Sequence, residues 1–108
     1  AQVLDMPARP SADIIAALGA HAVSHLADAL RRPDGATGAL RPRHRAGGLC
    51  GPAFTVRLPP GDNLFVQRAV DLAQPGDVIV VDVGGSTDVA VVGDIVSAWA
   101  AKRGVAGS

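Results

Sequence analysis

The segment spanning residues 51–104 restricts the possible folds most, because strand and helix patterns alternate along it. Residues 49–58 alternate apolar and polar side chains, as in a strand with one buried face. Residues 78–81 are continuously apolar and β-branched, which is typical of a strand covered on both faces. Helical patterns occupy residues 64–73 and 94–103. This alternation predicts an α/β domain.

Turn residues separate these elements. In Gln74-Pro75-Gly76-Asp77, proline and glycine hold the two central positions that a type II turn requires. Gly104 is expected to end the last helix in the left-handed conformation. The helix over 64–73 is predicted to face the core with Phe65, Ala69 and Leu72.

Residues 1–36 read as an N-terminal arm followed by two short helices. The arm covers residues 1–10, and Ser11 is expected to cap a helix over 12–18. Ser24 is expected to cap a second helix over 25–32. We treat the chain as one domain, with the arm and helices in residues 1–36 and the β/α core in residues 37–108.

Composition excludes several classes of protein. The 108 residues are 48% hydrophobic, which suits one domain with a packed core. Ten acidic and ten basic residues cancel, so a nucleic-acid partner is not expected. With one cysteine and no secretory signal pattern, we expect a cytoplasmic protein. No apolar run approaches the roughly 20 residues that cross a bilayer, so no membrane role is expected.

The start of the last predicted helix is the best candidate for a binding site. The first amides of a helix lack partners within it, so those following Gly93 can receive a carboxylate. Asp94, with Asp62 or Asp82, could supply oxygen ligands for a hard divalent cation. Structural explanations are also available, because Asp62, Asn63 and Asp94 all suit helix caps and Asp82 suits a strand end.

Other polar or reactive residues are assigned structural roles. Asp77 is read as turn chemistry, Cys50 as small core filler and Trp99 as packing. Surface or structural roles are expected for the histidines at positions 21, 25 and 44. An exposed loop is expected for the basic cluster of Arg41, Arg43, His44 and Arg45.

Four motifs of the core are distinctive in combination. They are Pro59-Pro60-Gly61-Asp62-Asn63, Asp71-Leu72-Ala73-Gln74-Pro75-Gly76-Asp77-Val78, Val81-Asp82-x-Gly84-Gly85 and Gly93-Asp94-Ile95. Together they resemble the motifs of the RraA-like family, which includes class II pyruvate aldolases acting on 4-hydroxy-4-methyl-2-oxoglutarate and the regulator of ribonuclease E. The helix over 23–30 also resembles the family's first helix.

The resemblance implies a layered β/β/α domain of the swivelling type that assembles into a homotrimer or hexamer. It implies active sites at subunit interfaces and a divalent cofactor, Mg²⁺ or Mn²⁺. The substrate carboxylate would contact Gly93, Asp94, Ile95 and Val96, with Asn63 nearby. Asp94 would approach the metal through water. The implied substrates are keto acids, namely pyruvate, oxaloacetate or 4-hydroxy-4-methyl-2-oxoglutarate.

The resemblance also implies an Arg-Asp pair beyond Ser108, in which the aspartate binds the metal directly. We therefore expect the sequence to be truncated at its C-terminus, as a fragment, a shortened gene product or half of a two-chain assembly, and inactive alone. The parent protein is predicted to be an aldolase, with oxaloacetate decarboxylation as a related activity. The alternative is a non-catalytic protein that binds and regulates a ribonuclease.

Overall fold

A computed structural model describes residues 3–31, 47–59, 64–85 and 93–107. The chain forms two compact units. The core unit combines Ala1–Arg9 with Gly51–Ser108, and the helical unit comprises Pro10–Cys50. The arm expected at the N-terminus therefore belongs with the β/α core rather than with the helices that follow it.

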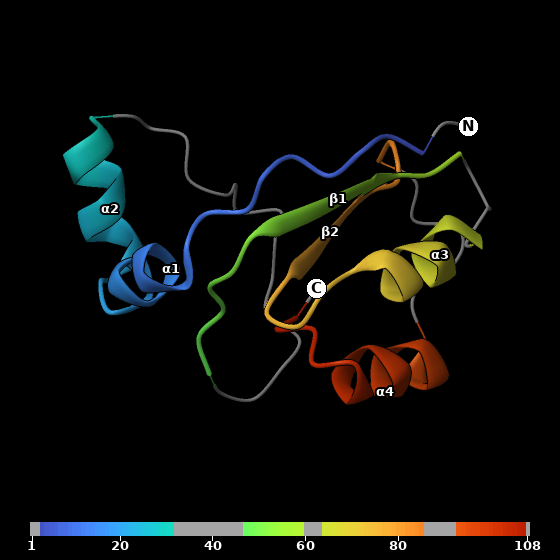
Figure 1. The fold of residues 1–108 in the computed structure, drawn as a ribbon. Helices are drawn as coiled ribbons and strands as arrows, with labels where there is room; N and C mark the ends of the chain where they lie inside the picture. Colours follow the sequence, from blue (N-terminus) through green and yellow to red (C-terminus); the bar gives the residue numbers. More distant parts are fainter. Residues whose placement is uncertain (1–2, 32–46, 60–63, 86–92, 108) are drawn as a thin grey trace. The chain divides into compact units, whose positions relative to one another are not determined.

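The core unit alternates strands and helices in the order β1 (Ala53–Arg57), α3 (Leu64–Leu72), β2 (Val78–Asp82) and α4 (Asp94–Lys102) (Figure 1). The two strands are parallel, with a register that runs from Ala53 opposite Val78 to Arg57 opposite Asp82. Parallel strands need a crossover connection, and α3 provides it. The predicted α/β class is confirmed.

The chain returns to the sheet after α4. Val78 forms a parallel bridge with Gly107, and the backbone N–H of Ile79 donates to the carbonyl of Gly107 at 2.9 Å. The segment around Gly107 therefore lies along the side of β2 that β1 does not occupy. This arrangement makes β2 a central strand at its amino-terminal end.

The hydrophobic core lies between α3 and one face of the sheet. Val66, Ala69 and Val70 of α3 are buried, and Ile79 of β2 packs with the last two. Leu72 is 41% exposed, so the prediction that it faces the core was wrong. The core-facing side of α3 is formed by Val66, Ala69 and Val70, and buried Ala73 follows directly after the helix. Leu72 lies on the exposed side instead.

Side chains of β1, β2 and α4 complete this core. Trp99 of α4 packs against the buried cluster, which confirms its predicted packing role. The half-buried residues around the cluster are Phe54, Val56, Val81, Val96, Trp99, Ala100 and Val105.

The opposite face of the sheet is open in the described part of the chain. Thr55 is exposed and Val80, its partner in the register, is 48% exposed. The prediction that β2 is covered on both faces is wrong for these residues, because α3 and α4 pack against the same face.

The turn before β2 has the predicted geometry. The backbone N–H of Asp77 donates to the carbonyl of Gln74 at 3.1 Å, and Gly76 has a φ of 88°. Gly104 has a φ of 80° just after α4, as predicted for its stop, and its carbonyl accepts the N–H of Gly76 at 2.8 Å. The hydrogen bond between these two glycines, both in the left-handed conformation, therefore joins the turn to the end of α4.

The helical unit contains α1 (Ala12–Gly19) and α2 (Val23–Leu30). Ser11 caps α1 as predicted, because its hydroxyl accepts the N–H of Ile14 at 3.3 Å. Ser24 does not cap α2, since that helix begins one residue earlier, at Val23, with Ala22 at the cap position. The observed bounds are those of the helix expected from the family resemblance, 23–30, and not the 25–32 predicted from Ser24 as a cap.

Neither of these two helices contains a buried residue. Cys50 is exposed, so its interpretation as core filler was wrong; its thiol lies 3.5 Å from the carbonyl oxygen of Ile15. His21 and His25 are exposed, in agreement with a surface role. Among the described helices, none combines the length and apolar character needed to cross a membrane.

Candidate functional site at the carboxyl edge of the sheet

The two strands end at one edge of the sheet, and α3 and α4 both begin at that edge (Figure 1). In open α/β sheets, ligands bind outside the carboxyl ends of the strands, where loops and helix starts meet. The structure therefore brings the start of α4 to the edge at which a binding site is expected.

The start of α4 is accessible. Gly93 is exposed and occupies the cap position with extended backbone, at φ −120° and ψ 179°. The first helical hydrogen bond runs from the N–H of Ser97 to the carbonyl of Gly93 at 2.9 Å. The amides of Asp94, Ile95 and Val96 precede that bond and have no acceptor within the helix.

Side chains at this helix start differ in exposure. Ile95 is 87% exposed, whereas Val96 is half-buried and packs against the core. A Cβ added at Gly93 would meet no atom of the described residues within 4 Å. The side chain of Asp94 lies outside the described part of the structure, as do Asp62 and Asn63 entirely.

An ion pair marks the ends of the two strands. Arg57 Nε lies 3.5 Å from Asp82 Oδ2, and both side chains are largely exposed, at 88% and 59%. Asp82 Oδ1 accepts the backbone N–H of Gly84 at 2.9 Å. Sequence reasoning identified Asp82 but not its pairing with Arg57. The strand register was the missing information, because it sets the two residues opposite each other.

Asp82 fits part of a divalent cation site. Its exposed carboxylate is a hard oxygen donor, and Mg²⁺ is commonly held by one or two carboxylates together with waters. In the described segments, no three His, Cys, Asp or Glu side chains gather as potential metal ligands. Among the described residues, Asp82 is therefore a single potential donor, and it also pairs with Arg57.

A hollow of about 240 Å³ lies beside α4. Its walls come from α3, β2, α4 and the segment after α4, and Ser97 supplies the hydroxyl among otherwise apolar side chains. This lining suits apolar groups, and a keto acid carboxylate would lose its hydration there without charged compensation. The amides at the helix start suit that carboxylate better.

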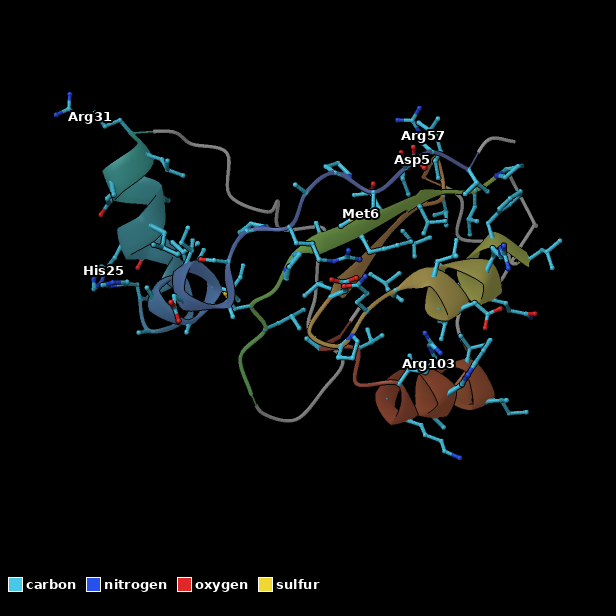
Figure 2. All side chains as sticks on the ribbon, viewed as in Figure 1. Asp5, Met6, His25, Arg31, Arg57 and Arg103 are labelled. Carbon is cyan, nitrogen blue, oxygen red and sulfur yellow. The ribbon has the colours of Figure 1, made fainter. Side chains whose placement is uncertain are left out.

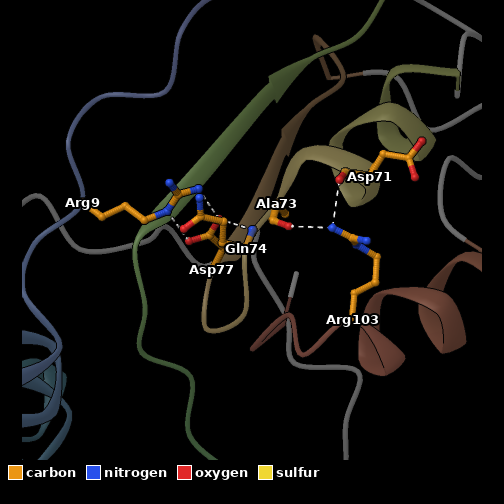
Figure 3. Close-up of polar contacts among 6 residues, drawn as sticks. All are labelled: Arg9, Asp71, Ala73, Gln74, Asp77 and Arg103. Atoms are coloured by element: carbon orange, nitrogen blue, oxygen red, sulfur yellow. Dashed lines mark hydrogen bonds and ion pairs between the residues drawn. The ribbon is translucent and has the colours of Figure 1, made fainter.

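The opposite edge of the sheet carries buried charge that sequence reasoning missed. Asp77 is 1% exposed and pairs with Arg9 of the arm (Figure 3). Hydrogen bonds from Arg9 lower the pKa of Asp77 below its usual range, and burial opposes this shift. The N–H of Gln74 also donates to the Asp77 carboxylate at 2.9 Å, so the predicted turn role is correct but incomplete. No spacing rule connects residues 9 and 77.

Arg103, directly after α4, stabilises the C-terminal end of α3. Its Nη2 donates to the carbonyl oxygens of Asp71 at 2.9 Å and Ala73 at 3.3 Å (Figure 3). These carbonyls lie in the last turn of α3 and directly after it, where acceptors lack partners within the helix. Arg103 therefore joins the ends of α3 and α4.

Comparison with known proteins agrees with this arrangement. A family model for RraA-like proteins, described as Aldolase/RraA, matches residues 23–108. A protein from Halalkalibacterium halodurans that carries the provisional name 4-hydroxy-4-methyl-2-oxoglutarate aldolase is 40% identical over 82 residues. The match covers 76% of this chain and 39% of that relative, so the chain spans less than half the length of the relative. Because the family match includes all four elements of the core unit and α2, the chain belongs to the RraA-like family.

Proposed function

We propose that this chain forms part of a class II pyruvate aldolase that depends on a divalent metal and acts on 4-hydroxy-4-methyl-2-oxoglutarate or a related keto acid. The observation that carries the proposal is the exposed start of α4 at the carboxyl edge of the sheet. Family membership and the name of the relative from Halalkalibacterium halodurans support the reaction class.

The amides of Asp94, Ile95 and Val96 would hold the substrate carboxylate. They precede the first helical hydrogen bond, so no carbonyl of the helix accepts their N–H groups, and these groups would donate to the anion. The absence of a side chain at Gly93 leaves open space through which the carboxylate can approach the backbone. Binding in this way would fix the orientation of the keto group relative to the strand ends.

Asp94 and Asn63 would act beside that carboxylate. Asp94 would hold a water in the coordination shell of Mg²⁺ or Mn²⁺, and Asn63 would hydrogen-bond the substrate from the loop before α3. Asp82 is a further oxygen donor at this edge. A divalent cation bound there would polarise the keto oxygen and offset the negative charge that develops on it during C–C cleavage.

The one lysine of these 108 residues lies far from the helix start. Lys102 is the sole lysine of the sequence and lies in the last turn of α4. At a rise of about 1.5 Å per residue, nine residues place it roughly 13 Å along the helix from Gly93. It therefore lies at the opposite edge of the sheet from the helix start.

Cleavage breaks the C–C bond of the aldol and moves the hydroxyl proton to a base, which leaves a carbonyl product and pyruvate after protonation. Oxaloacetate decarboxylation breaks an equivalent bond and releases CO₂ in place of the carbonyl product. A site that stabilises charge on the keto oxygen can support both reactions. We further propose a cytoplasmic homotrimer or hexamer, in which a neighbouring subunit contributes to the site.

The test measures pyruvate released from oxaloacetate and from 4-hydroxy-4-methyl-2-oxoglutarate with Mg²⁺, in the protein that carries this chain. Asp94→Ala should reduce kcat/KM about 10–100-fold, the effect expected for a residue that orients metal-bound groups. Asp71→Ala is the matched control, because its side chain is exposed on α3 and its carbonyl, not its carboxylate, contacts Arg103.

Equal turnover in the Asp94→Ala variant and the wild type would contradict the role of Asp94. Absence of turnover in both proteins, at any Mg²⁺ or Mn²⁺ concentration, would contradict the aldolase. It would leave the non-catalytic alternative, regulation of a ribonuclease through a protein contact.

A further inference from the structure

Residues 3–9, the described part of the N-terminal arm in the core unit, are joined to the rest of that unit by a partly buried ion pair. Arg9 Nε donates to Asp77 Oδ1 at 2.8 Å, and Arg9 Nη2 donates to Asp77 Oδ2 at 2.7 Å (Figure 3). The side chain of Asp77 is 1% exposed and that of Arg9 is 23% exposed. Two parallel bonds from one guanidinium combine charge with a fixed geometry, which is the strongest common form of this pairing.

Asp77 is held by its own turn independently of Arg9. Its Oδ2 accepts the N–H of Gln74 at 2.9 Å, and its backbone N–H donates to the carbonyl of Gln74 at 3.1 Å. Its backbone carbonyl accepts the N–H of Ala106 at 2.8 Å. The turn therefore presents a preformed acceptor, and the arm can leave it without breaking these backbone bonds.

The same turn holds the chain where it returns from the helical unit. The N–H of Val78 donates to the carbonyl of Pro52 at 2.8 Å, and Gly51 packs directly against the carbonyl of Gly76. The chain enters the helical unit after Arg9 and leaves it before Gly51. Both connections are thus fixed at one turn, the first through side chains and the second through backbone.

We propose that Arg9 and Asp77 form a latch that straps the arm to the core and can open while β1, β2, α3 and α4 stay folded. When the latch is closed, it fixes the first connection to the helical unit. When it is open, residues 3–9 and that connection are released, and the backbone contacts at Pro52 keep the second connection in place. This proposal does not depend on the proposed function, because the latch lies at the opposite edge of the sheet from the start of α4.

The sequence provides one natural reporter for each part. Met6 is the sole methionine; it lies in the arm, where it is labelled in Figure 2, and it is half-buried. Trp99 is the sole tryptophan and packs against the core. In the 108-residue chain, a ¹³C-methyl label on methionine therefore reports the arm, and tryptophan fluorescence reports the core.

The experiment compares Arg9→Gln with Arg68→Gln, which removes an exposed arginine on α3 of the same unit. In Arg9→Gln we expect the Met6 methyl signal to move to its position in the urea-unfolded chain and to sharpen. The Trp99 emission maximum should stay at its native value in both variants. Arg68→Gln should leave the Met6 signal unchanged.

Three results would overturn the latch. A native Met6 signal in Arg9→Gln would show that the ion pair does not hold the arm. An unfolded Met6 signal already present in the wild type would show that the arm is not docked. Loss of the native Trp99 emission in Arg9→Gln would show that the pair supports the whole core rather than a separable strap.

Discussion

The carbonyl oxygen of Gly76 occupies the space in which a side chain at Gly51 would have to lie. This contact brings the segment that precedes β1 against the turn that precedes β2. The N–H of Val78 donates to the carbonyl of Pro52 beside it, so the parallel pairing of the strands begins at this contact. Only glycine allows the two backbones to approach so closely.

Gly51→Ala should therefore destabilise the core by about 1–3 kcal/mol, the usual cost of inserting a methyl group where no space exists. Gly48→Ala is the control, because a Cβ at Gly48 meets no atom within 4 Å in the described part of the chain. Urea unfolding followed by Trp99 fluorescence measures both. Equal midpoints for the two variants would contradict the close approach at Gly51.

Val70→Ala should lower the free energy of unfolding by about 2 kcal/mol, because Val70 is 1% exposed and its two lost methyl groups would leave a cavity. Leu72→Ala, on the exposed side of the same helix, should cost much less although it removes more atoms. A larger loss for Leu72→Ala would show that the core-facing side of α3 is the one expected from sequence.

The ion pair of Asp77 should make stability depend on pH in the acid range. Hydrogen bonds from Arg9 lower the native pKa of Asp77 below the value of about 3.9 expected in the unfolded chain. Its contribution is therefore complete above that unfolded value, and it is lost as the pH falls through the lower native pKa.

The measurement compares urea midpoints of the wild type and Asp77→Asn between pH 7 and pH 2. Their difference should be constant from pH 7 to pH 5 and should shrink below about pH 4, where the unfolded carboxyl begins to protonate. A difference that persists unchanged at pH 2 would contradict the depressed pKa of Asp77.

Gly93→Ala tests the binding role of the helix start separately from folding. The extended backbone at Gly93 accepts alanine, and the added Cβ meets none of the described atoms within 4 Å. Stability should therefore change by less than about 1 kcal/mol. If the substrate carboxylate approaches these amides, KM for the keto acid should rise severalfold while the melting temperature stays almost constant. An unchanged KM would argue against a carboxylate at this position.

Local sequence patterns predicted the turns and helix ends of the core unit better than they predicted which residues are buried. The proline and glycine of the turn and the left-handed stop at Gly104 were correct because each depends on backbone geometry within a few residues. The exposure of Val80 was missed because a run of β-branched residues does not reveal how many layers cover it. Burial is decided by contacts distant in sequence.

In the candidate site, too, local features were predicted and contacts between distant residues were not. Gly93 and Asp94 were placed correctly at a helix start, since a glycine followed by an acidic residue is a local signal. The Arg57–Asp82 pair at the strand ends requires the register of two strands, and the Arg9–Asp77 pair joins residues 68 positions apart. Neither pairing could be derived from spacing along the chain.

Because α3 and α4 begin at the same edge of the sheet, their peptide dipoles reinforce each other instead of cancelling. Each helix places roughly half a positive charge at its start and half a negative charge at its end. Lys102 and Arg103 lie at the negative ends, and Arg103 contacts the last carbonyls of α3. Within the core unit, these basic side chains thus offset the partial charge at the helix ends, and a small anion should be drawn towards the helix starts at low ionic strength.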